Sequence, residues 1–421
     1  MKGQQRWRNL SFAAGAAAAA LFAAWDLYKW IEAYLSDHFH NDFTFYLTAA
    51  RVGVSHGWSS LYDLSLLQAE LDAIGSHIKI AELARYISPP PLAWLALPLV
   101  PLPYEVGYWV WSSWLLIALV CAWYWTAPGI GPWRFVHLAA AVGWLPVIYG
   151  LQLGQPALFV AAGVAACYAL LQARRPFWAG LAVGALVLKP QLAFLVPAAL
   201  LVTGRTRAFW GSVAAFGVLG GASAIALGPS GIAALEARLS FAASVSANRD
   251  LTLYALIGNL AVTRVVQVAV ALWALALAYR LGRRRGARRA PDSQGHEWVL
   301  IPALIGGMLA TPYLHLDDLV MLGLAGWLYL RTSPPAWTWS LILATVVACE
   351  GLPIWGPLPL IAGELGAMVL LSVAALKADH RDSEHHGTEG EHDARLERNG
   401  QHVAVDGQPE PVDDPARQPG T

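Results

Sequence analysis

Long apolar runs with few charges recur from Leu10 to Leu376, and they limit the possible folds of this chain more than any other feature. A helix of about 20 residues spans a hydrocarbon core of about 30 Å, and several runs reach that length. Of the 421 residues, 57% are hydrophobic and 13% are charged, whereas soluble domains are about 45–50% apolar. The runs do not alternate in polarity as barrel strands do. The sequence therefore predicts an all-α polytopic membrane protein.

Clusters of basic residues predict the orientation of the spans, because Lys and Arg near span ends stay on the cytoplasmic side. When every cluster is placed inside, the apolar runs fit about twelve crossings with both termini in the cytoplasm of a plasma-membrane protein. The basic clusters are Arg6 and Arg8, Arg134, Arg174 and Arg175, Arg205 and Arg207, 280–289, Arg331 and Lys377. The expected spans are 10–33, 103–127, 134–151, 156–173, 177–188, 191–203, 208–227, 260–280, 298–313, 318–331, 337–349 and 355–376.

The chain ends differ from the membrane part in composition. Residues 1–9 are expected to be a short cytoplasmic N-terminus, followed by an uncleaved first span, because no small-residue cleavage site interrupts it. Residues 10–376 form the expected transmembrane domain. Residues 377–421 hold 11 of the 28 acidic residues and lack apolar periodicity. We expect this segment to be a disordered cytoplasmic tail whose histidines are solvated rather than metal-bound.

The predicted topology puts most isolated polar groups on the external side. They lie in the segment 34–90, at Gln155, at Lys189, in the segment 228–259 and in the stretch 311–318. Ionisable groups at membrane depth are costly, so they suggest a functional cavity, although any one of them could simply sit at the water interface.

The external segment 34–90 is long for a connection. Within it, "LSLLQAELDAIG", opened by Asp63, and "IKIAELARYI" are amphipathic and predict helices that lie in the membrane interface. The proline-rich stretch 87–103 is too short to cross the membrane alone and predicts a partly immersed hairpin or broken helix.

Two classes of function fit these features. A transporter usually has internal repeats and binding groups near the midplane, and the sequence shows no convincing repeat. An enzyme with its site at the outer boundary fits better, since Asp42 could deprotonate a hydroxyl while a cationic group faces a phosphate leaving group. A transporter or flippase of lipid-linked saccharides without catalysis remains the alternative.

Four ordered motifs then point to a family. These are "NDFTFYLTAARVGVSHGWSSLYD", "SPPPLAWLALPLVPLP", "LGQPALFVAAGVAACYALLQARRPFWAGLAVGALVLKPQ" and "ATPYLHLDDLVML". Together they resemble glycosyltransferase family 87 of the GT-C superfamily, which includes mycobacterial mannosyltransferases acting on phosphatidylinositol mannosides. The resemblance covers about residues 10–375. It implies a GT-C-type bundle that transfers a sugar, mannose or similar, from a polyprenyl-phosphate donor to a lipid or glycan acceptor on the external face, with inversion.

The resemblance also implies residue roles. Asp42 matches the general base, and His315 matches a polar position that supports this base or contacts the donor phosphate. Gln155 and Lys189 match two motifs expected near the donor. Ala157 and Ser88 depart from the usual pattern, so the mycobacterial substrate is not carried over.

Further candidates come from the residues themselves. Arg51 and Arg249 are candidates for the phosphate, and Trp355 for stacking on a sugar. Adjacent Asp317 and Asp318 are candidate substrate contacts, but neighbouring helical positions point about 100° apart, which makes joint binding of a metal awkward. No metal or cofactor is required, because basic side chains can stabilise the leaving phosphate. The expected partners are membrane lipids, the donor and the acceptor, with no nucleic acid.

Simpler interpretations exist for several of these residues. Asp42 could be the N-cap of a helix that begins "FTFYLTAARV". Lys189 could extend its ammonium to the interface, Arg51 could anchor a helix there, and His315 could belong to an interfacial loop.

Overall fold

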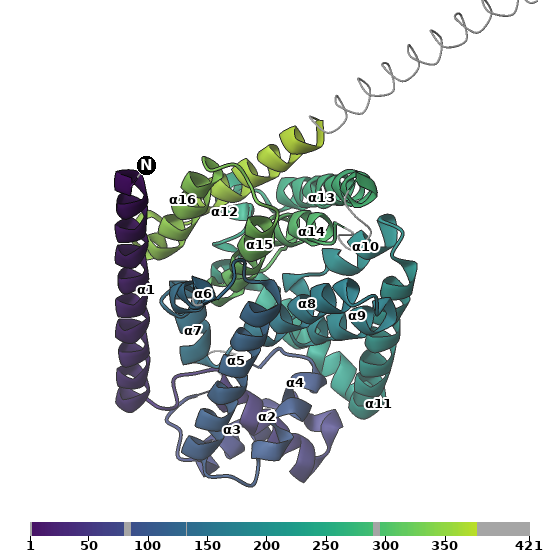
Figure 1. The fold of residues 1–421 in the computed structure, drawn as a ribbon. Helices are drawn as coiled ribbons and strands as arrows, with labels where there is room; N and C mark the ends of the chain where they lie inside the picture. The colour runs from purple at the N-terminus through teal and green to yellow at the C-terminus, as the bar shows by residue number, and fades with distance from the viewer. Residues whose placement is uncertain (1, 80–85, 132, 289–294, 377–421) are drawn as a thin grey trace, which may run out of the picture. The chain divides into compact units, whose positions relative to one another are not determined.

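A computed structural model describes residues 2–79, 86–131, 133–288 and 295–376. Within these residues the chain forms α-helices and short 3₁₀ helices and has no β-strand (Figure 1). The chain divides into two compact units, Met1–Leu371 and Ser372–Thr421, and all side-chain contacts described below lie in the first. The predicted tail, 377–421, lies outside the described residues.

Four helices of the described residues are long and apolar enough to cross a membrane. They are α5 (Tyr104–Thr126), α11 (Thr206–Ser244), the part Leu260–Arg283 of α13 (Leu260–Arg288) and the helix Leu358–Leu376. The bent pair α6 (Trp133–Val142) and α7 (Leu145–Leu153), with 58° between the two helices, would make a fifth span. A membrane protein with several apolar helices is therefore confirmed, whereas twelve crossings are not.

The lower count has a physical reason, because many predicted spans are short helices. α8 (Ala157–Gln172), α14 (Glu297–Ala310) and α16 (Thr338–Glu350) each have fewer than 18 residues. The predicted span 318–331 contains the end of η7 (Leu316–Leu319) and α15 (Val320–Arg331), which has only 12 residues. Each of these helices falls below the length of about 20 residues that a straight crossing needs.

The first helix, α1 (Lys2–Ser36), covers the predicted span 10–33 without a break. It lies beside α6 and α7 (Figure 1). A Cβ atom at Gly143, in the break between these two helices, would lie 2.7 Å from the backbone nitrogen of Ala23. The glycine therefore allows α1 to approach the break closely.

The predicted spans 177–188 and 191–203 are not two complete helices. This stretch contains α9 (Pro176–Ala182), η4 (Val183–Leu188), η5 (Pro190–Leu192) and α10 (Leu195–Val202). Pro190 has no N–H to donate and disfavours helical geometry at the residue before it, and Lys189 accordingly has φ −154° and ψ 76°. The helical backbone is therefore interrupted at Lys189, and the side chain of this residue is buried.

The predicted span 208–227 ends at a break within α11 (Thr206–Ser244). α11 continues to Ser244 through a kink at Gly228, whose φ is 59°. A glycine adopts this conformation without strain, and Pro229 then fits the first turn of the second half. The predicted external segment 228–259 thus contains the second half of α11, η6 (Ser246–Arg249) and α12 (Tyr254–Ile257).

The described residues of the segment 34–90 contain three short helices after the end of α1, and the proline-rich stretch follows. They are α2 (Phe43–His56), η1 (Trp58–Ser60) and α3 (Leu64–Ala73). The Asp63 side chain caps α3 as predicted, since Oδ1 accepts hydrogen bonds from the backbone N–H groups of Ser65 at 2.8 Å and Leu66 at 3.2 Å. The second predicted amphipathic helix lies largely outside the described residues. The proline-rich stretch forms α4 (Pro90–Ala96), which continues directly into η3 (Leu97–Leu99).

Candidate active site

Asp42 immediately precedes α2, but it does not cap this helix through its side chain. The neighbouring Asn41 supplies that contact, because its Oδ1 accepts a hydrogen bond from the backbone N–H of Thr44 at 3.2 Å. The backbone N–H of Asp42 donates to the carbonyl of Leu153, at the end of α7, at 2.8 Å. The interpretation of Asp42 as a side-chain N-cap is therefore wrong, and its carboxylate is directed to another partner.

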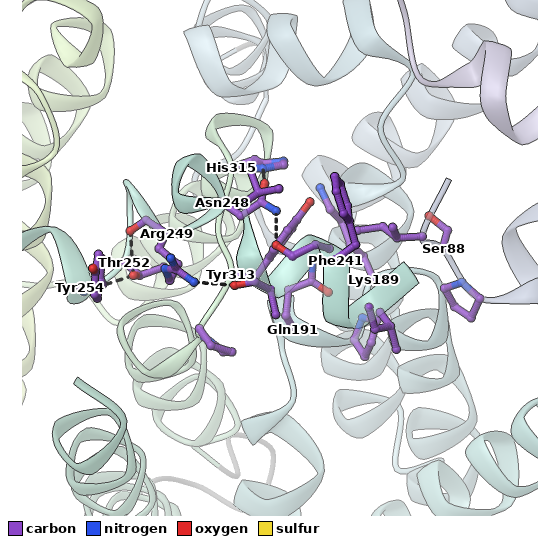
Figure 2. Close-up of a pocket in the computed structure, with 18 of the residues that line it drawn as sticks. Ser88, Lys189, Gln191, Phe241, Asn248, Arg249, Thr252, Tyr254, Tyr313 and His315 are labelled. Carbon is purple, nitrogen blue, oxygen red and sulfur yellow. Dashed lines mark hydrogen bonds between the residues drawn. The ribbon is translucent and has the colours of Figure 1, made fainter. Parts of the chain in front are cut away.

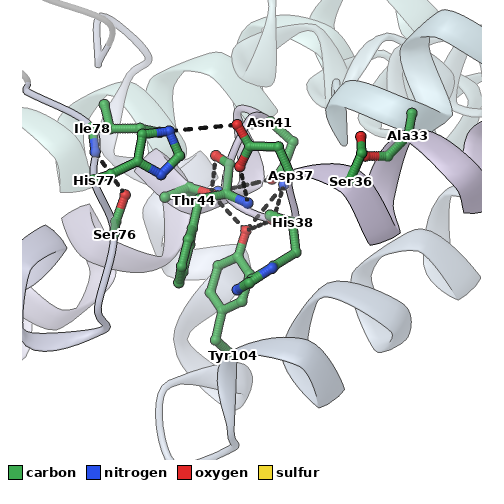
Figure 3. Close-up of polar contacts among 11 residues, drawn as sticks. Ala33, Ser36, Asp37, His38, Asn41, Thr44, Ser76, His77, Ile78 and Tyr104 are labelled. Atoms are coloured by element: carbon green, nitrogen blue, oxygen red, sulfur yellow. Dashed lines mark hydrogen bonds and ion pairs between the residues drawn. The ribbon is translucent and has the colours of Figure 1, made fainter.

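Asn41 also fastens the loop before α2 to α5 (Figure 3). Its Nδ2 donates to the hydroxyl of Tyr104 at 3.0 Å and to the carbonyl of His38 at 2.8 Å. The hydroxyl oxygen of Thr44 lies 2.6 Å from that of Tyr104. Asn41 and Thr44 are buried, so these bonds give Asp42 a fixed backbone position.

The side chain of Gln155 forms a hydrogen bond with the carboxylate of Asp42. Its Nε2 donates to Asp42 Oδ2, and its Oε1 accepts hydrogen bonds from Lys189 Nζ at 3.0 Å and from the hydroxyl of Tyr46 at 3.4 Å. The residue before it, Gly154, ends α7 with φ 71°. A Cβ atom at Gly154 would lie 3.0 Å from Cβ of Phe43, so the glycine lets the end of α7 approach α2.

Lys189 is held by two carboxylates. Its Nζ lies 2.5 Å from Asp317 Oδ2 and also contacts Asp318 Oδ1. Both aspartates are fully buried and Lys189 is 8% exposed, and buried charges are tolerated when they are paired in this way. The two aspartates can share this cation although neighbouring positions diverge, because one ammonium has three donors and can lie between diverging carboxylates.

His315 connects the same cluster to the segment after α11. Its backbone N–H donates to Asp318 Oδ2 at 2.8 Å, and its Nε2 lies 3.0 Å from Asn248 Oδ1. Burial lowers the pKa of the His315 imidazole below its ordinary value, and Lys189 lowers it further although Asp317 opposes this. The ring is therefore neutral at neutral pH. Asn248 was not predicted as a site residue, since nothing in its sequence context marks it.

Asp42, Gln155, Lys189, Asn248 and His315 line a cavity of about 620 Å³, and part of its lining is drawn in Figure 2. A volume of this size suits a small-molecule or cofactor-sized ligand. The second half of α11 and the start of α13 add an apolar wall with Leu235, Leu239 and Leu260. Further polar residues of the lining that the sequence did not single out include Tyr46, Gln191, Arg264, Gln267 and Tyr313. Polar residues from distant parts of the sequence thus meet at one site.

The comparisons with known proteins identify the family. The model of glycosyltransferase family 87 matches residues 86–312, which is more than half of the chain. The chain belongs to glycosyltransferase family 87. No curated protein and no solved structure matches it significantly. As a family 87 member it is a membrane glycosyltransferase, and Asp42 and His315, which lie outside the matched residues, reach the site through the fold.

The fold of this family 87 glycosyltransferase brings five of the predicted site residues to the cavity wall. They are Asp42, Gln155, Lys189, Arg249 and His315. Asp317 and Asp318 lie behind Lys189 and do not line the cavity. Neither Arg51 on α2 nor Trp355 on α17 (Leu352–Trp355) lines it, and Trp355 is 55% exposed.

Arg249 is the predicted cation that faces the cavity of this family 87 member. Its Nη1 donates to the carbonyl of Ala243 at 2.5 Å, and its guanidinium lies 4.9 Å from the ring centroid of Tyr254 (Figure 2). An arginine over an aromatic ring retains donors for an anion. Among the described residues no group of three or more His, Cys, Asp or Glu side chains could hold a metal ion.

Proposed function

We propose that this family 87 glycosyltransferase transfers a sugar from a polyprenyl-phosphate donor to a lipid or glycan acceptor, with Asp42 as the general base. The observation that carries the proposal is the position of the Asp42 carboxylate. It lies on the wall of the cavity and is held by Gln155, while Asn41 caps α2. A carboxylate fixed at a cavity and released from helix capping is suited to accept a proton.

The proposed step is a displacement at the anomeric carbon. The acceptor hydroxyl oxygen forms a bond to this carbon while its proton passes to the Asp42 carboxylate. The bond between the anomeric carbon and the phosphate oxygen breaks, and polyprenyl phosphate leaves with the electron pair. Because the acceptor attacks from the side opposite the leaving group, the configuration at the anomeric carbon inverts.

The remaining wall of the cavity supports a lipid phosphate as the leaving group. Arg249 and Arg264 carry positive charge there, and His315 offers a polar ring. Cationic groups stabilise the negative charge that collects on the leaving oxygen. The apolar wall from α11 and α13 would accommodate the first isoprenoid units. We assign the phosphate contact to Arg249 and His315, and the reaction to the external face of the plasma membrane.

Lys189 takes a different role from the donor contact expected from the sequence. Its ammonium already contacts Asp317, Asp318 and Gln155. A second anion at Lys189 would compete with two buried carboxylates. In this proposal Lys189 therefore orients Gln155, and the reaction uses neither a metal nor an organic cofactor.

The test is Asp42→Asn, expressed in a strain that lacks the gene. We expect transfer to fall by about 10²- to 10⁴-fold, the usual contribution of a general base. Mass spectrometry of lipids and glycans from the deletion strain identifies the missing sugar and the acceptor. Membranes supplied with polyprenyl-phosphate sugars then give the rate of transfer for each variant.

The matched control is Asp37→Asn. Asp37 lies in the same loop as Asp42, between α1 and α2. Its carboxylate is 3.5 Å from the imidazole of His77, and it does not line the cavity. This variant should retain the wild-type rate. Full activity of Asp42→Asn at normal expression would overturn the assignment of the base.

A further inference from the structure

Behind Asp42 lies a chain of side chains that connects four separate elements. Asp42 precedes α2, Gln155 follows α7, Lys189 lies between η4 and η5, and the two aspartates belong to η7. Each link is a hydrogen bond or ion pair between side chains, first from Gln155 to Asp42, then from Lys189 to Gln155, and last from Lys189 to Asp317 and Asp318. Apart from half-buried Asp42, every member is at most 8% exposed.

The chemistry of these groups fixes the orientation of the Gln155 amide. An ammonium has only donors, so it must face the amide oxygen. The amide nitrogen, which has two N–H donors and no acceptor, then faces the carboxylate of Asp42. If the amide were reversed, its oxygen would face a carboxylate that can only accept, and both contacts would be lost.

The two buried aspartates keep Lys189 in its charged, donor-only form. An isolated buried lysine tends to lose its proton, because burial disfavours the ammonium. A neutral amine can also accept a hydrogen bond, so it would no longer impose one orientation on the amide. The carboxylates of Asp317 and Asp318 favour the ammonium form of Lys189, so the amide of Gln155 keeps one orientation.

We propose that Asp317, Asp318 and Lys189 are positioning residues that hold the Gln155 amide in one orientation, and that this amide holds the Asp42 carboxylate ionised and in place. The catalytic meaning of this network rests on the proposed function of Asp42. The hydrogen-bonded arrangement itself does not, and it can be tested without a substrate.

Other groups near Asp42 contribute little charge. Tyr46 on α2, Tyr149 on α7 and Tyr313 after α14 also interact with it electrostatically. Phenols stay neutral below about pH 9. Arg249 and Arg264 border the same cavity, but their charge is constant over this range. Changes in the protonation of Asp42 between pH 4 and 8 therefore report on Gln155, on the Lys189 cluster and on His315, which also borders the cavity.

The experiment uses purified full-length protein and dicyclohexylcarbodiimide, an apolar reagent that modifies protonated carboxyl groups. Trypsin cuts after Lys29 and Arg51 and releases one peptide that contains both Asp42 and Asp37. Mass spectrometry of this peptide gives the pH midpoint of Asp42 labelling, and Asp37 is an internal reference. We expect Gln155→Glu to raise the Asp42 midpoint by about 1 to 2 pH units, because a charge-assisted donor is lost.

The matched control is Gln191→Glu. Gln191 lines the same cavity near Lys189, and no hydrogen bond joins its side chain to the chain of contacts described above. The control introduces the same charge into the same cavity, so it should shift the Asp42 midpoint much less than Gln155→Glu. Equal shifts in both variants would mean that charge alone acts on Asp42, which would overturn the proposal.

Substitution of Asp317 and Asp318 distinguishes the proposed network from a direct effect of their charge on Asp42. The double variant Asp317→Asn/Asp318→Asn removes two negative charges, and by charge alone it would lower the Asp42 midpoint. The proposed network predicts a rise, because Lys189 is no longer held as an ammonium. A fall, or no change, would overturn the proposal.

A double-mutant cycle tests the order of the links. Lys189→Met should raise the Asp42 midpoint in the wild-type background and add little in a Gln155→Leu background. Full additivity would show that Lys189 acts on Asp42 directly and would refute the network. Should Lys189→Met fail to fold, Gln155→Glu and the double asparagine variant decide the question. If the labelling shifts appear but Asp42→Asn retains transferase activity, the network stands and the proposed general base does not.

Discussion

The two ends of the cavity are built in different ways. At the acid end, Asp42 bonds to Gln155, and Lys189 lies between Gln155 and two buried carboxylates from a different part of the chain. At the arginine end, Arg249 bonds to the carbonyl of Ala243 and lies over Tyr254, both close to it in sequence.

This difference assigns different work to the two ends. Buried polar groups that are paired with one another hold their geometry before a ligand arrives, which is the condition for effective stabilisation of a transition state. A guanidinium held by local contacts can adjust to an incoming anion with little loss elsewhere. The acid end therefore suits the chemical step, and the arginine end suits capture of the donor.

The largest expected difference between the acid end and the arginine end is in the free energy of unfolding that a substitution costs. Lys189→Met leaves two fully buried aspartates without a cation, and we expect it to lower the free energy of unfolding by about 3–5 kcal/mol. Arg249→Met should cost less than about 1 kcal/mol, since no buried charge depends on it. Denaturant unfolding of the purified proteins in detergent measures both values.

A triple variant sharpens this result. Lys189→Met combined with Asp317→Asn and Asp318→Asn removes all three charges together and should recover most of the lost stability. If Lys189→Met alone is as stable as the wild type, the cluster is not the fixed element described above.

The second effect concerns kinetics. Arg249→Gln should raise KM for the lipid-phosphate donor by about 10- to 100-fold with little change in kcat, because a charge-assisted contact to the donor is lost in both the ground state and the transition state. Asp42→Asn should instead lower kcat. Arg238→Gln, on α11 and not among the residues that line the cavity, is the matched control. An unchanged KM in Arg249→Gln would move the phosphate contact to another residue, such as Arg264.

Much of the local structure could be predicted from the sequence. The apolar runs predicted an all-α membrane protein, Asp63 predicted the start of α3, and the gap between the expected spans 177–188 and 191–203 coincides with the break at Lys189. The gathering of polar residues was also foreseen, since five of the predicted site residues line one cavity. These features depend on composition or on residues a few positions apart.

Other features depend on contacts between distant residues. Lys189 and Asp317 are 128 positions apart, and nothing local to either shows that they form an ion pair. The second half of α11, which follows the break at Gly228 and runs to Ser244, was not predicted as a helix. The twelve predicted crossings are not confirmed for a related reason, because short apolar helices have the same composition as full-length crossings.

The smallest expected effect compares two neighbouring residues at the acid end. Asn41→Ala removes the N-cap of α2 and the bond to Tyr104, and should lower the free energy of unfolding by about 1 kcal/mol. Asn41→Ser can restore a cap, so it should lose less stability than Asn41→Ala. Asp42→Asn keeps the size of its side chain and an acceptor for Gln155, so it should change stability by less than about 0.5 kcal/mol while it removes transfer. Unfolding and transfer assays on the three variants measure both quantities, and a stability loss centred on Asp42 rather than Asn41 would return Asp42 to a structural role.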